Sequence, residues 1–212
     1  MTPDQIQLTS SSLAKANKMH PGSTRWGGKE KLTRLIASIG LCFGGILGMV
    51  GSFAPSPSLR NLAWGLDGIA LIIAGALLTV YYFRKGYDVT AAGFLVFTIG
   101  EAIILSSSAI DIDANVSTFG AGVGLWAASL SLISFQKLFP IIVRFTGFIA
   151  AVLFAFVSTQ IFTGNPLNAL TKPLPFYAYP FFAATIFGWA WKLLRTTSGS
   201  PFHFNPDPPR SN

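Results

Sequence analysis

The sequence is poor in charged residues, and this absence sets its class. Only 11% of its 212 residues are charged, whereas 51% are apolar. Soluble domains carry roughly 25% charged residues. A soluble α/β domain would also alternate strand and helix signals, and no such alternation is found. The low charge and the long apolar runs together indicate a membrane protein with several spans.

Cysteine and histidine are almost missing, and this excludes several chemistries. Cys42 is the single cysteine, so no disulfide can form within the chain. The two histidines, His20 and His203, lie in polar tails. Haem ligation by two histidines, a histidine–carboxylate metal site and a serine–histidine dyad inside the membrane are therefore excluded. We find no nucleotide signature, and we expect neither an enzyme nor a bound cofactor.

Six apolar segments are long enough to cross a bilayer, which takes about 20 residues each. They cover roughly residues 33–54, 60–83, 90–110, 118–137, 143–163 and 175–194. The sequence thus predicts an all-α bundle of six transmembrane helices over residues 31–195. The polar segments 1–30 and 196–212 are predicted to be disordered tails.

The fourth and fifth segments need a turn between them. Residues 118–163 are almost continuously apolar, and a single helix of that length would reach about 70 Å, far beyond a bilayer core of roughly 30 Å. Lys137, Pro140 and Arg144 interrupt the run. Because proline lacks a backbone donor and disfavours helix before it, we place the turn there.

Lysine and arginine gather on one side of the predicted bundle. Thirteen of the fifteen lie in the tails or in the loops on the same side, whereas Arg60 and Lys172 alone lie on the other. The net charge of +7 therefore reflects membrane orientation and not nucleic-acid binding. The asymmetry predicts a multi-pass protein of the plasma (inner) membrane with both termini in the cytosol.

Glu101 is the most unusual residue of the apolar segments, because it lies near the middle of the third one. An acidic residue there costs roughly 2.5–3.5 kcal/mol on insertion scales. Thr98, Glu101 and Ser108 fall within about 80° of one another on a helix, so we expect them to form a polar stripe that faces the bundle interior. Two readings stay open: Glu101 carries a proton or binds a cation, or it is a neutral acid that hydrogen-bonds a neighbouring helix.

Three aspartates lie closer to the predicted outer side. We expect Asp67 about 9 Å below the outer end of its helix, shallower than Glu101. Asp67 either pairs with Arg60, Asn61 or water, or forms the outer station of a path to Glu101. Asp111 and Asp113 lie in the third loop, either as a solvated cap or as a shallow attractor for cations.

Glycines recur every four residues in two of the segments. Gly40, Gly44 and Gly48 form one row, and Gly120 and Gly124 form another. Small residues on one face allow helices to approach closely. We interpret both rows as helix-packing surfaces, with self-association through them as the alternative.

Two functions remain open from the sequence. The first is a small transporter or channel-like protein for a proton, a cation or a small solute, with Glu101 and Asp67 as polar stations. The second is a non-catalytic scaffold or accessory subunit that packs against a partner membrane protein or a second copy of the chain. A transporter should place both carboxyl groups in one cavity, whereas a scaffold should bury Glu101 against a hydroxyl and expose a face of small residues to lipid.

Overall fold

A computed structural model describes residues 23–108, 115–165, 167–174 and 176–195, with residues 23–27 and 108 described for the backbone only. In these ranges the regular secondary structure is entirely helical, and turns or irregular segments connect the helices. No strand occurs in these ranges, as the sequence predicts. The α-helices are α2 (Ser23–Ser52), α3 (Pro57–Arg84), α4 (Asp88–Ser108), α5 (Val116–Phe135), α6 (Ile141–Phe162) and α7 (Tyr179–Arg195). A short 3-10 helix, η1 (Phe176–Ala178), precedes α7.

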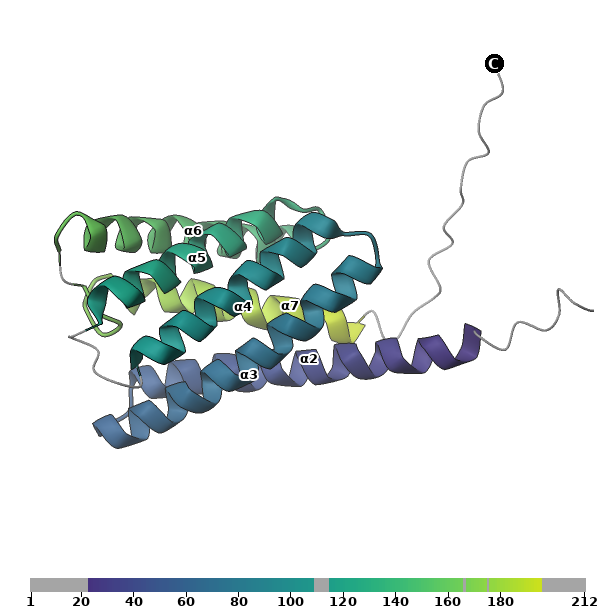
Figure 1. Cartoon of the computed structure of the whole chain (residues 1–212), viewed down its shortest axis with the longest axis horizontal. Coiled ribbons are helices and arrows are strands. Elements are labelled where there is room, and N and C mark those ends of the chain that lie inside the picture. Colours follow the sequence, from purple (N-terminus) through teal and green to yellow (C-terminus); the bar gives the residue numbers. More distant parts are fainter. Residues whose placement is uncertain (1–22, 109–114, 166, 175, 196–212) are drawn as a thin grey trace, which may run out of the picture.

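The pairwise contacts between the helices close into a ring. Each one packs against the next along the chain, and α7 packs against both α6 and α2. The start of α2 and the end of α7 lie at the same end of the bundle, which we call the terminal end, and the opposite end is the far end. The start of α2 projects beyond the other helices (Figure 1).

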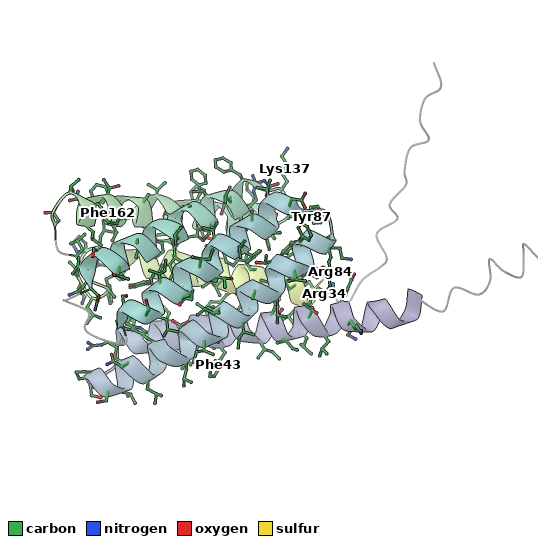
Figure 2. All side chains as sticks on the ribbon, in the orientation of Figure 1. Arg34, Phe43, Arg84, Tyr87, Lys137 and Phe162 are labelled. Carbon is green, nitrogen blue, oxygen red and sulfur yellow. The ribbon has the colours of Figure 1, made fainter. Side chains whose placement is uncertain are left out.

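The outer surface of the ring is apolar. Large exposed side chains cover α2, α3 and α6, for example Phe43, Ile73 and Phe156, each about half exposed. Arg34, Arg84 and Lys137 are found at the terminal end (Figure 2). Such a large apolar surface is not stable in water, and the described helices α2 to α6 are each long and apolar enough to cross a bilayer. The protein is therefore a helical membrane protein with five clear candidate spans.

Most helix limits lie within a few residues of the predicted ones, with two differences. Helix α2 begins at Ser23, ten residues early, and takes in the last part of the segment that was expected to be a disordered tail. Helix α7 is only 17 residues long, because residues 176–178 form η1 instead. At about 1.5 Å per residue, α7 alone is roughly 25 Å long, which makes it the shortest of the described α-helices, and it is not among the five candidate spans.

The turn predicted within the long apolar run is present. Helix α5 ends at Phe135 and α6 starts at Ile141, immediately after Pro140. Arg144 reaches back across the turn and donates from Nε to the carbonyl oxygen of Ser134 at 2.8 Å. Its guanidinium therefore binds a carbonyl group that the end of α5 leaves without a helical partner.

Both glycine rows lie at contacts between helices inside the ring. A Cβ atom at Gly40 would lie 3.0 Å from the carbonyl oxygen of Ala70 in α3. On α5, Gly124 faces α6, and the hydroxyl of Ser158 in α6 donates to the carbonyl oxygen of Gly120 at 2.9 Å. The small residues are therefore used to bring neighbouring helices of the same chain together.

Replacing Gly40 by leucine should destabilise the bundle. The new side chain would meet the α3 backbone at Ala70, which cannot move aside alone. Overpacking of this kind costs about 1–3 kcal/mol in the free energy of unfolding, measurable by denaturant titration in detergent. Gly65→Leu is the control, because no atom lies within 4 Å of a Cβ there. Equal stability of the two variants would contradict the close α2–α3 contact.

Cysteine labelling should reveal the topology. In a Cys42→Ala background, Lys172→Cys lies at the far end, whereas Lys137→Cys and Arg195→Cys lie at the terminal end. Because the far end is predicted to be outside, a membrane-impermeant maleimide should label position 172 in intact cells and positions 137 and 195 only after lysis. Labelling of both 172 and 195 in intact cells would show that α7 does not cross the membrane.

Candidate functional site

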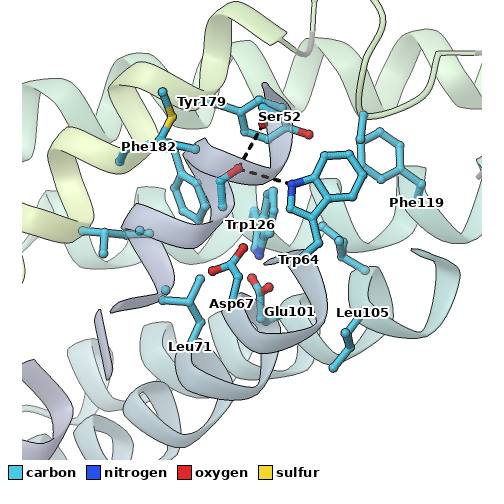
Figure 3. A pocket seen from close by; sticks show the side chains of 18 residues that line it. Ser52, Trp64, Asp67, Leu71, Glu101, Leu105, Phe119, Trp126, Tyr179 and Phe182 are labelled. Atoms are coloured by element: carbon cyan, nitrogen blue, oxygen red, sulfur yellow. Dashed lines mark hydrogen bonds between the residues drawn. The ribbon is translucent and has the colours of Figure 1, made fainter. Parts of the chain in front are cut away.

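A cavity lies inside the far half of the ring, and five of the six helices line it (Figure 3). Its side chains come from α2, α3, α4, α5 and α7, together with Ala169 of the α6–α7 connection. Ser52, the last residue of α2, and Tyr179, the first residue of α7, also line it, so the cavity extends to the far end. The volume of the cavity is about 60 Å³, measured as the space open to the centre of a water-sized sphere.

Asp67 of α3 and Glu101 of α4 both line this cavity, and Figure 3 shows their carboxyl groups next to each other. The two groups are close enough to interact electrostatically. Glu101 is only 3% exposed, and Asp67 is half-buried. Both residues were predicted from the sequence as possible members of one polar path, and in the structure both line the same cavity.

Asp67 was predicted to lie closer to the outer side than Glu101, and this prediction is wrong. Helix α3 starts at Pro57, three residues earlier than predicted, so Asp67 lies about 15 Å along it from the far end at roughly 1.5 Å per residue. Glu101 lies about 10 Å from the far end of α4 by the same measure. Asp67 is therefore not a shallower outer station, because it lies at a depth similar to that of Glu101.

Three buried polar atoms in this cavity have no hydrogen-bond partner among the described residues. They are Oδ1 of Asp67, Oε2 of Glu101 and Nε1 of Trp126. The indole N–H of Trp126 faces the carboxyl group of Glu101 without reaching regular hydrogen-bond geometry. Buried polar atoms are almost always paired in proteins, so two acceptors and one donor without partners at one cavity indicate a place for a polar occupant.

Gly44 and Gly48 make the room for Asp67. A Cβ atom at Gly48 would lie 2.7 Å from Oδ2 of Asp67, and one at Gly44 would lie 3.0 Å from Oδ1. Any larger residue would push the carboxyl group away from its present place. The row that the sequence analysis assigned to packing therefore also forms one wall of the cavity.

Asp67 does not pair with Arg60 in the described structure. The guanidinium of Arg60 lies 5.9 Å from the ring centre of Trp64 instead. Trp64 donates its indole N–H to the carbonyl oxygen of Gly48 at 3.2 Å, which holds α3 against α2 near the far end. An ion pair among the described residues lies outside the cavity: Nζ of Lys85 is 2.8 Å from Oε2 of Glu30.

Aromatic side chains close the cavity toward the terminal end. Phe182 of α7 packs against Trp126 with ring centres 4.6 Å apart and against Phe97 at 6.0 Å. Trp189, two helical turns further along α7, contacts Phe97 at 5.9 Å and Phe94 at 5.0 Å. Trp189, Phe94 and Phe97 are at most 1% exposed, so solvent does not reach these rings from outside.

The other members of the expected polar path lie elsewhere. Thr98 donates its hydroxyl to the carbonyl oxygen of Phe94 at 2.8 Å and faces Gly75 of α3, outside the cavity. The backbone of Ser108 ends α4, and its side chain lies outside the described part of the chain. Asp111 and Asp113 lie outside the described residues.

Sequence reasoning missed Trp126 and Phe182, which form the apolar side of the site. Trp126 lies near the middle of its predicted span, whereas tryptophan in membrane helices is enriched at the two interfaces. That displacement is a signal that could have singled it out. For Phe182 we find no such signal, since the chain has 19 phenylalanines and most of them lie in apolar runs.

Cysteine reactivity should separate the two halves of the ring. Ala183 and Ala190 are both buried in α7, at 9% and 1% exposure, but only Ala183 lines the cavity. In a Cys42→Ala background, Ala183→Cys should react at least tenfold faster with a small water-soluble thiol reagent than Ala190→Cys does. Equal rates, measured by mass spectrometry, would contradict a cavity that water can enter.

Comparisons with known proteins assign no function to this cavity. No protein-family model, curated protein sequence or solved structure matches the chain. The chemistry of the site rests on the adjacent carboxyl groups of Asp67 and Glu101, the indole N–H of Trp126 and an apolar surround.

Proposed function

We propose that the protein is a small transporter that takes up a proton or a small cation into the cavity and carries it across the membrane. The observation that supports this most is the placement of Asp67 and Glu101 in one cavity, each with a buried oxygen that has no regular hydrogen-bond partner among the described residues. A transporter is expected to hold both carboxyl groups in one shared cavity, and both Asp67 and Glu101 line this one.

The chemistry of the pair favours a positively charged cargo. Two ionised carboxylates next to each other repel, and the apolar surround weakens the screening of that repulsion. A proton or a cation held between them removes it. Of the described residues that line the cavity, none is a lysine, arginine or histidine that could do the same.

Transport would require the terminal half of the ring to open. The cavity reaches the far end, and the packed rings of Phe97, Phe182 and Trp189 separate it from the terminal end. We therefore propose that the described conformation is loaded from the far end, and that movement of α7 releases the cargo at the other. Helix α7 is suited to this because Gly45 of α2 and its own Gly188 lie at its contacts with neighbouring helices.

The topology forms part of the same proposal. We propose that the chain crosses the plasma membrane six times. In this topology η1 and α7 together form the last span, and both termini lie in the cytosol. The combined length of η1 and α7, residues 176–195, would be about 30 Å, close to the thickness of the bilayer core. The cavity would then take its cargo from the outside.

The scaffold alternative has less support. A scaffold was expected to expose a row of small residues to lipid and to bury Glu101 against a hydroxyl group. Instead, Gly40, Gly48 and Gly120 face other helices of the same chain, and Glu101 has a carboxyl oxygen without a partner. The outer surface carries large side chains.

Removing either carboxyl charge should stop transport. In liposomes with a pH-sensitive dye inside and the membrane potential clamped, we expect proton flux driven by a pH gradient to fall at least tenfold in Glu101→Gln and in Asp67→Asn. Each substitution keeps the shape of the side chain and removes the exchangeable proton. Glu30→Gln is the matched control, because Glu30 pairs with Lys85 away from the cavity. Full flux in Glu101→Gln would refute proton transport.

A further inference from the structure

We infer that the cavity binds a small alkylammonium ion, that is, a protonated primary amine with a short carbon chain. The inference names the substrate class of the proposed transport site and rests on that proposed function. It follows from the combination of hydrogen-bond acceptors, apolar walls and size within one cavity.

The acceptors match an ammonium group. Oδ1 of Asp67 and Oε2 of Glu101 are buried, have no regular hydrogen-bond donor in the described part of the chain, and lie in adjacent carboxyl groups. An ammonium group has three N–H donors and one positive charge, so a single ion can donate to both carboxyl groups and offset their repulsion. Hydrogen bonds between charged groups are roughly twice as strong as neutral ones.

The remaining wall suits the carbon chain. Leu71 of α3, Ile104 of α4 and Ile186 of α7 line the cavity together with the rings of Trp126 and Phe182. An ion that is charged at one end and apolar at the other therefore finds a matching surface for each end.

The cavity has room for a short chain. The centre of a water-sized sphere can move within about 60 Å³ of it, so the cavity extends over more than a single water position, which takes roughly 10–15 Å³ of occupied volume. Butylammonium, with its four-carbon chain, is a probe of this small size.

A bare metal ion fits less well. Transition metals take three or more ligands from histidine, cysteine or carboxylate side chains in protein sites, and no cluster of three such residues occurs in the described part of the chain. A hard cation takes six or more oxygen ligands. The carbonyl oxygen of Gly48 already accepts hydrogen bonds from Trp64 and Ser52, which leaves the two carboxyl groups as the main donors to a metal.

The test is calorimetric titration of the purified full chain in detergent with four probes. These are butylammonium, the neutral isostere butanol, tetramethylammonium and potassium, all as chloride salts where charged. We expect saturable binding of butylammonium at least tenfold tighter than that of the other three. Butanol lacks the charge, tetramethylammonium lacks N–H donors, and potassium lacks the apolar part.

Variants locate the binding. Asp67→Asn and Glu101→Gln should each weaken butylammonium binding at least tenfold, whereas Glu30→Gln should leave it unchanged. Ala183→Leu should also weaken it, because the larger side chain fills the apolar side of the cavity and leaves both carboxyl groups in place. The comparison of the four probes on the unmodified protein tests the inference even where a variant does not fold.

The outcomes separate this inference from the proposed function. Equal affinity for butanol, tetramethylammonium or potassium overturns the inference, as does binding that both carboxyl variants leave intact. Proton flux that depends on Glu101 without butylammonium binding overturns the inference and supports the proposed function. Selective binding that depends on both carboxyl groups supports the inference, even where the liposome assay shows no flux and the transport role fails.

Discussion

The close approach of α2 to α3 is the contact on which the site depends. Gly44 and Gly48 present bare backbone to α3, and the carboxyl group of Asp67 occupies the space that their missing side chains leave. Methyl groups at either position would come within about 3 Å of a carboxyl oxygen. The same feature therefore packs two helices and positions an acidic group inside the bundle, opposite Glu101 of α4.

The ring of helices divides its interior into two unlike halves. Toward the far end it encloses a cavity with two carboxyl groups, and toward the terminal end it is filled by aromatic rings, including those of Phe94 and Trp189. Helix α7 contributes to both halves, with Phe182 at the boundary. A single element therefore lines the cavity and also fills the aromatic half.

The architecture could be predicted from the sequence to a large extent. Long apolar runs must form helices in a bilayer because the backbone has no other way to satisfy its polar groups there. Pro140 and Arg144 marked the turn, and the structure has it between Phe135 and Ile141. The early start of α2 was missed because a polar composition alone does not distinguish a helix that projects beyond the membrane from a disordered tail. The late start of α7 was missed because η1 replaces its first turn.

The candidate site was only half predictable. A glutamate in the middle of an apolar span is costly wherever it points, so Glu101 was evident from the sequence alone. Its partner was proposed at the wrong depth, since a difference of three residues in the start of α3 moves Asp67 by about 5 Å. The contributions of Trp126 and Phe182 depend on which faces of α5 and α7 turn inward. Helical periodicity does not reveal this when every face is apolar.

The sequence by itself determined that the chain is a helical membrane protein, where its helices lie, and that it carries an acidic residue within an apolar span. These features follow from composition and from the energy of polar groups in lipid, and both act locally along the chain. Only the tertiary structure decided that Asp67 and Glu101 share one cavity, that glycines make its wall and that aromatic rings close it. Those relations depend on the rotation and depth of each helix against its neighbours, which are set by packing between residues far apart in the sequence.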